Sequence, residues 1–141
     1  MKNLLLIIVT AGSLVGCVAP SVLPPHAHST PAQSHLVDGI WKGTYVCQQG
    51  VTNLTLSLQT GLYGDVFGVF SFSANASNRA VPSGQFRVSG RLQGNRLFLK
   101  AGDWISQPPG YTPLDVDGII DLVEKSYTGT LCGYPFGLRK I

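Results

Sequence analysis

Charge is scarce in this chain and is not concentrated in any segment. Only 12% of its 141 residues are charged, and the formal net charge is +3. One of the positive charges is Lys2. From Asp38 onward nine Lys and Arg residues are set against seven Asp and Glu residues, a net charge of +2. A nucleic-acid surface needs a basic run or patch, so we expect no nucleic-acid partner.

Histidine is missing from the part of the chain that we expect to fold. The three histidines, His26, His28 and His35, all precede Asp38. Ser-His-Asp and Cys-His mechanisms need a histidine at the site. A zinc site would need further thiolate or carboxylate ligands, which this segment lacks. We expect solvated linker histidines, no metal, no cofactor, no catalytic residue and no enzyme activity.

Helical periodicity is also absent, and strand patterns take its place. No stretch of ten residues or more has a helical hydrophobic period, whereas short alternating segments are separated by turn residues. The segment 66–72 is more continuously apolar, as a strand buried on both faces would be. We predict an all-β antiparallel meander, closed or nearly closed as an up-and-down barrel of seven or eight short strands, with a β-sandwich as the alternative. The expected strands cover residues 39–47, 54–58, 66–72, 86–92, 97–100, 116–122, 127–132 and 136–140.

Residues 1–16 have the form of a secretory leader. Lys2 follows Met1, an unbroken apolar run covers residues 4–9, and smaller residues follow. An apolar run this short does not span a bilayer, which takes about 20 residues, but it suits a cleaved signal peptide. We expect residues 1–16 to be removed.

The four residues Leu14-Val15-Gly16-Cys17 resemble the lipobox of bacterial lipoproteins. In that family the cysteine thiol receives diacylglycerol, the leader is cut before it, and the new amino terminus is acylated. The resemblance implies a cell-envelope protein that is held to the membrane through lipid on Cys17. Val18, not aspartate, follows Cys17, which in a diderm host resembles an outer-membrane sorting signal. An ordinary signal peptide with a coincidental cysteine is the alternative.

The segment 17–37 is expected to be a tether. After Cys17 it carries four prolines, many small residues and no Asp, Glu, Lys or Arg. Such a composition favours a semi-extended linker over a packed element. We therefore divide the chain into a signal peptide (1–16), a lipidated and proline-rich tether (17–37) and a β domain (38–141).

The remaining two cysteines form a natural pair. Lipid on Cys17 leaves Cys47 and Cys132, an even number in an oxidising compartment. Both follow a Gly-Thr step, in strands expected at opposite ends of the domain. We predict a Cys47–Cys132 disulfide that brings the first strand to a late one, as barrel closure requires. Two separate thiols are the alternative.

Two further resemblances concern the β domain. Gly39-x-Trp41, together with Arg139, is similar to the arrangement in lipocalins and related calycin barrels, where an arginine stacks over the tryptophan at the closed end. A wider pattern resembles an uncharacterised bacterial secreted domain and implies the fold and the cysteine pair but no activity. That pattern comprises Trp41-x-Gly43-x-Tyr45-x-Cys47-x-x-Gly50-x-Thr52-x-Leu54-x-Leu56, Phe70-x-Phe72, Pro82-x-Gly84-x-Phe86, Trp104-Ile105-x-x-Pro108-x-Gly110-Tyr111, Cys132 and Phe136-x-Leu138-Arg139.

The segment 101–111 is the candidate partner-binding loop. It carries Asp103, Trp104, Ile105 and Tyr111 around a rigid Pro-Pro-Gly turn. Either the aromatic rings are presented to a partner, or they fold inward and plug the barrel end.

Three carboxylates are the candidates for catalysis or metal binding within the β domain. Asp115, Asp117 and Asp121 fall on one face of an expected strand, where they could act as acid and base or hold calcium. We expect them to be its solvated side, because Val116 and Ile120 form the opposite face.

The sequence therefore predicts a membrane-anchored binding or interaction module without catalysis, with an envelope protein or a small apolar ligand as the candidate partner. The alternative is a calycin-like carrier of a small apolar ligand. A deep apolar cavity between the strands would favour the carrier. A filled core with an exposed aromatic loop would favour a protein partner.

Overall fold

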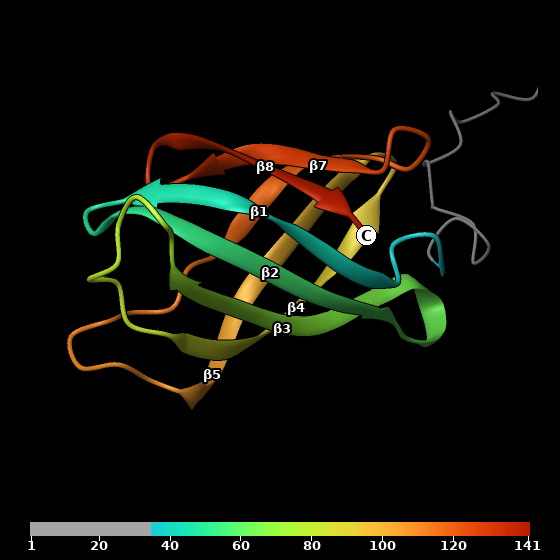
Figure 1. The fold of residues 1–141 in the computed structure, drawn as a ribbon. Helices are drawn as coiled ribbons and strands as arrows, with labels where there is room; N and C mark the ends of the chain where they lie inside the picture. Colours follow the sequence, from blue (N-terminus) through green and yellow to red (C-terminus); the bar gives the residue numbers. More distant parts are fainter. Residues whose placement is uncertain (1–34) are drawn as a thin grey trace, which may run out of the picture.

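The computed structural model describes residues 35–141, which form a closed barrel of eight antiparallel strands in sequence order. All eight expected strands are present, and the architecture is the up-and-down barrel rather than the sandwich (Figure 1). Among these residues no helix is both long and apolar enough to cross a bilayer. The strands are β1 (Gly39–Cys47), β2 (Gly50–Thr60), β3 (Asp65–Ala74), β4 (Gly84–Gln93), β5 (Arg96–Ser106), β6 (Val116–Asp121), β7 (Ser126–Leu131) and β8 (Tyr134–Lys140), with a short 3-10 turn, η1 (Leu62–Gly64), before β3.

Several sequence predictions lie outside the described residues. These are the signal peptide (1–16), the lipidation site Cys17, the tether up to residue 34, and the histidines His26 and His28. His35 is described and exposed, and its Nδ1 lies 3.4 Å from Oδ2 of Asp38.

The interior of the barrel is filled by its own side chains. Strand alternation sends every second residue inward, and an eight-stranded barrel is just wide enough for such side chains to fill. Phe70 lies near the middle, with its ring stacked on Phe86 at 4.5 Å and meeting Tyr45 edge-on at 5.6 Å between centroids. The largest fully buried side chains are Trp41, Tyr127, Phe70, Phe86, Leu54, Leu56, Leu58, Leu92, Leu97, Leu99, Leu138 and Val37.

The expectation that residues 66–72 are buried on both faces is wrong. Val66, Phe70 and Phe72 point inward, but Phe67 is 51% exposed and Val69 is only partly buried. The outer face of β3 is covered by no other layer, because a single closed sheet has only one interior. The apolar residues Phe67 and Val69 of this segment lie on that outer face.

One end of the barrel is closed by the chain that leads into β1. The indole Nε1 of Trp41 donates a 2.9 Å hydrogen bond to the carbonyl of Val37, and both residues are fully buried. The cation over the Trp41 ring is Lys140, with Nζ 5.9 Å from the centroid. The expected Arg139 points elsewhere, because its Nη1 donates to the Glu124 carbonyl at 3.0 Å. We call this end of the barrel, where Val37, Trp41 and Lys140 meet, the closed end.

Two pairs of neighbouring strands, β1–β8 and β5–β6, are hydrogen-bonded to one another only near the closed end; we call these two contacts the seams of the barrel. The β1–β8 ladder runs from Trp41↔Lys140 to Thr44↔Gly137, and the β5–β6 ladder runs from Arg96↔Ile119 to Leu99↔Val116. Beyond these pairs β1 and β5 continue, whereas β6, β7 and β8 are shorter strands. The barrel wall is therefore incomplete on the β6–β8 side at the end opposite the closed end.

Candidate functional site

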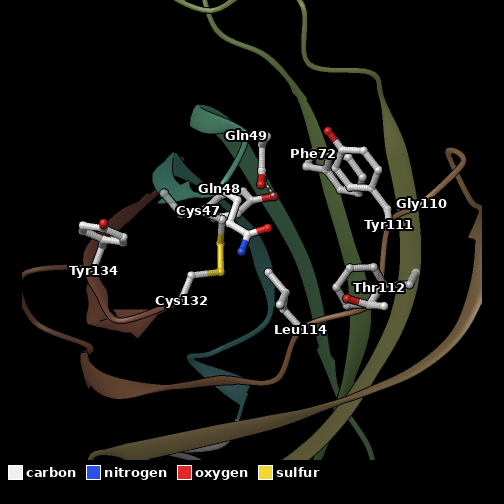
Figure 2. Close-up of a pocket in the computed structure, with 12 residues that line it drawn as sticks. Cys47, Gln48, Gln49, Phe72, Gly110, Tyr111, Thr112, Leu114, Cys132 and Tyr134 are labelled. Atoms are coloured by element: carbon white, nitrogen blue, oxygen red, sulfur yellow. Dashed lines mark hydrogen bonds between the residues drawn. A yellow bond between two sulfur atoms is a disulfide. The ribbon is translucent and has the colours of Figure 1, made fainter.

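We call the incomplete end of the barrel the mouth. It carries the connections 48–49, 75–83, 107–115 and 132–133. A pocket of about 680 Å³ opens there (Figure 2), within the range typical of small-molecule sites. Its lining consists of Tyr45, Cys47, Gln48, Gln49, Phe72, Phe86, Gly110, Tyr111, Thr112, Leu114, Cys132 and Tyr134.

A disulfide between Cys47 and Cys132 forms one side of the mouth. Cys47 is the last residue of β1, and the two Cα atoms lie 5.3 Å apart, within the usual range for a disulfide. Cys132 does not lie in a strand as expected, but in the turn between β7 and β8 with φ of 52°. The disulfide joins β1 to this turn beyond the last hydrogen-bonded pair of the β1–β8 seam.

The connection 107–115 joins β5 to β6 at the other side of the mouth. The amide of Tyr111 donates to the Pro108 carbonyl at 3.3 Å, and Gly110 has φ of 79°. This Pro-Pro-Gly-Tyr sequence forms a type II turn, in which the third residue needs positive φ. The connection is fastened to β5 at its far end, because Oδ1 of Asp115 accepts a 2.7 Å hydrogen bond from the Ala101 amide.

The aromatic residues of the predicted loop fold onto the mouth. The Tyr111 ring stacks on Phe72 with centroids 5.3 Å apart and an interplanar angle of 15°. The Trp104 ring meets Phe86 edge-on at 5.2 Å. Figure 2 shows the Phe72–Tyr111 pair across the mouth from the disulfide. The inward alternative is therefore the observed one, although Trp104 and Tyr111 remain partly exposed.

The four candidate loop residues do not form one site. Asp103, Trp104 and Ile105 belong to β5 rather than to a loop, and only Tyr111 lies in the connection. Trp104 faces inward because the β4–β5 register shifts between Phe86 and Val88, and such a bulge reverses the inward–outward phase of the residues that follow it. Asp103 and Ile105 are exposed and do not line the mouth pocket.

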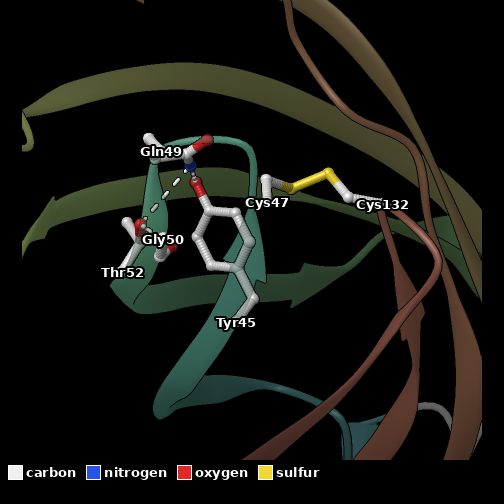
Figure 3. Close-up of a disulfide and its surroundings, with 6 residues drawn as sticks. All are labelled: Tyr45, Cys47, Gln49, Gly50, Thr52 and Cys132. Atoms are coloured by element: carbon white, nitrogen blue, oxygen red, sulfur yellow. Dashed lines mark hydrogen bonds between the residues drawn. A yellow bond between two sulfur atoms is a disulfide. The ribbon is translucent and has the colours of Figure 1, made fainter.

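The sequence does not predict the hydrogen-bonded group that Tyr45, Gln49 and Thr52 form in the wall of the mouth. Gln49 Nε2 donates to the Tyr45 hydroxyl at 3.2 Å and to Thr52 Oγ1 at 3.3 Å (Figure 3). Thr52 in turn donates to the Gly50 carbonyl at 3.1 Å. Burial, reinforced by the nearby Tyr111, raises the pKa of Tyr45 to about 12. The phenol is therefore neutral at physiological pH. The inward position of Tyr45 was predictable from alternation, but its link to a turn glutamine was not.

The three carboxylates of the β6 region serve separate structural roles. Asp117 forms a two-pronged ion pair with Arg96 on the outer face, and this hydrogen-bonded guanidinium lowers the Asp117 pKa. Asp121 Oδ1 accepts hydrogen bonds from the amides of residues 123 and 124. Within residues 35–141 no three His, Cys, Asp or Glu side chains are grouped to hold a metal ion.

The mouth is thus aromatic and polar but uncharged. None of the described residues that line it is Asp, Glu, Lys, Arg or His. Such a site has rings for stacking and amide or hydroxyl groups for hydrogen bonds, but it lacks a strong acid, base or counter-ion. Comparisons with protein-family models, with curated proteins and with solved structures found no match to the chain.

Proposed function

We propose that this chain is a membrane-anchored lipoprotein that displays its small β-barrel as a non-catalytic binding module in the cell envelope, with the mouth as its binding site. The lipobox-like residues 14–17 and the proline-rich tether support the anchor. The observation that carries the binding role is the mouth itself, an aromatic-lined pocket at the end of an otherwise filled barrel.

The placement of the mouth suits a displayed module. The tether enters β1 at the closed end, where the C-terminus also lies (Figure 1). The mouth is at the opposite end of the barrel, where Cys47 ends β1. A barrel held by its closed end therefore presents the mouth away from its point of attachment.

The absence of catalysis is part of the proposal. General acid–base chemistry needs an ionisable group poised near neutral pH. Among the described residues that line the mouth, the only ionisable side chains are tyrosines, because both cysteines are joined in the disulfide. Tyr45, with a pKa of about 12, is a hydrogen-bond donor rather than a base at physiological pH.

The alternative of a carrier that encloses an apolar ligand deep in the barrel has less support. Trp41, Phe70, Phe86 and Tyr127 occupy the interior and are each at most 1% exposed. A ligand of this barrel would bind at the mouth, above Phe72 and Phe86, and not between the strands.

Affinity capture from solubilised envelopes tests the binding role. The full-length protein is compared with Thr112→Arg, which places a charged side chain at the exposed rim of the mouth, and with Gln93→Arg, which adds the same charge near the closed end. We expect a component that the parent and Gln93→Arg retain and that Thr112→Arg loses by at least about tenfold, since an unpaired charge obstructs a neutral site. Equal retention by all three proteins would contradict binding at the mouth.

A further inference from the structure

We infer that the closed end of the barrel is itself a membrane-binding surface, whose exposed apolar side chains insert between the lipid headgroups. This second, non-covalent contact rests on the proposed function and is made by the barrel rather than by its anchor. Four features of the closed end support it: the exposure of its apolar side chains, their spread, the balance of its charges, and the place where the tether joins.

The most exposed large apolar side chains of the described chain all lie at the closed end. Exposure is 80% for Leu62, 90% for Tyr63, 88% for Val123 and 72% for Ile141, and no other large hydrophobic residue among 35–141 exceeds 54%. Turns are usually built from Gly, Pro, Asn, Asp and Ser, and Tyr63 has φ of 69°, which a bulky residue rarely adopts. Such side chains, gathered at one end of a small domain, indicate a contact surface.

These side chains are spread around the closed end. Leu62 and Tyr63 belong to the connection between β2 and β3, whereas Val123 belongs to the connection between β6 and β7. In the strand order of the barrel the two connections lie on opposite sides, with the C-terminal Ile141 between them (Figure 1). A flat, extended surface such as a bilayer reaches both sides at once, whereas a bound peptide would reach only one.

The charges beside these apolar side chains are balanced. Arg91 is paired with Asp65 directly after the first connection, and Glu124 precedes Lys125 in the second. Anionic lipid attracts clusters of basic residues, which these two connections do not contain. We therefore expect the closed end to bind zwitterionic lipid through its apolar side chains.

The expected tether joins the barrel at the same end. It leads into Leu36, whose carbonyl accepts a 2.8 Å hydrogen bond from Lys140 Nζ at the end of β8. A short flexible linker holds two linked surfaces at an effective concentration on the order of 1 mM. With lipid on Cys17, even a weak contact between the closed end and the bilayer is therefore populated, and the mouth faces away from the membrane.

Quenching of tryptophan fluorescence by brominated lipid tests this contact. The lipoprotein is reconstituted in phosphatidylcholine vesicles with or without bromine on the acyl chains, which quenches a tryptophan at the edge of the hydrocarbon. Tyr63→Trp reports on the closed end, and the parent, with Trp41 and Trp104, gives the baseline. Ile105→Trp is the matched control, because Ile105 is 48% exposed, lies near the opposite end of β5 and does not line the mouth.

A charge on the other side of the closed end separates insertion from simple closeness to the membrane. Val123→Asp is added to Tyr63→Trp, and Ile105→Asp added to Tyr63→Trp is its control. Because moving a carboxylate out of water is unfavourable, Val123→Asp should abolish most of the quenching at position 63, although the tether is unchanged. Ile105→Asp should leave that quenching as it was.

We expect brominated lipid to quench the tryptophan introduced at position 63 and not the one at position 105. Absent quenching at position 63, equal quenching at both positions, or quenching that persists with Val123→Asp would overturn the membrane contact. Acylated, vesicle-bound protein without quenching leaves the proposed anchor standing. Unacylated protein that is quenched at position 63 contradicts the anchor and supports the contact.

Discussion

Tyr127 shows how one polar atom is accommodated inside the barrel. Its side chain is fully buried, and its hydroxyl donates to the Leu97 carbonyl at 2.8 Å. The ring crosses beneath β6 at Gly118, where an added Cβ would lie 3.0 Å from Tyr127 Cε2 and 2.3 Å from the Thr128 carbonyl oxygen. A glycine in a barrel strand often marks such a close approach, and here it makes room for the tyrosine.

Tyr127→Phe should therefore destabilise the barrel without changing its shape. The substitution removes the Tyr127–Leu97 hydrogen bond in the interior, which should lower the free energy of unfolding by about 1–2 kcal/mol and the Tm by roughly 4–10 °C. Thermal unfolding followed by circular dichroism measures the change. Tyr63→Phe is the control, because Tyr63 is 90% exposed. Similar melting of Tyr127→Phe and the parent would contradict a structural role for this hydroxyl.

Individual inward residues were readable from the sequence, but their partners were not. Alternation placed Trp41, Tyr45 and Cys47 on one face, and all three are buried. The closeness of Lys140 to the Trp41 ring depends on the β1–β8 register, which no local pattern encodes. The resemblance to calycin barrels pointed to Arg139, the neighbouring residue, whose side chain lies on the opposite face of β8.

Among the elements, the regular strands were predicted and the irregular one was not. The inward leucines of β2, Leu54, Leu56 and Leu58, alternate without interruption. In β5 the alternation breaks at the register shifts opposite Phe86, so Trp104 was assigned to a loop. A bulge looks like the end of a strand in the sequence, because it inserts one residue and reverses the phase.

The disulfide joins β1 to the β7–β8 turn where the β1–β8 ladder has ended, at Thr44↔Gly137. A cross-link between residues 85 positions apart restricts the unfolded chain strongly, and loss of such a bond costs about 2–5 kcal/mol. We expect Cys47→Ser/Cys132→Ser to melt at least about 8 °C below the oxidised parent. The melt of the parent should fall on reduction, and that of the variant should not. Two free thiols in protein isolated from the envelope, or equal melting temperatures, would contradict this role.

On the scale of the whole molecule, the closed up-and-down barrel was predictable and its open end was not. Eight short alternating segments with turn signals between them indicate a meander, and closure removes exposed strand edges. The mouth results from strand lengths and ladder ends, because β6 to β8 stop short of β1 and β5. Its polar group, Tyr45 with Gln49, joins residues whose roles depend on that geometry.

The proposed display of this barrel depends on its attachment to a membrane through Cys17. Cys17→Ser removes the thiol that stands directly after the lipobox-like residues 14–16, whereas Cys47→Ser/Cys132→Ser leaves Cys17 as the only cysteine and is the matched control. Cells that express the parent or either variant are labelled with palmitate, and membrane fractions are examined for label on the protein. We predict labelled, membrane-bound protein for the parent and the double variant, and unlabelled protein for Cys17→Ser. Label and membrane partitioning that persist in Cys17→Ser would contradict the anchor and, with it, the displayed binding module.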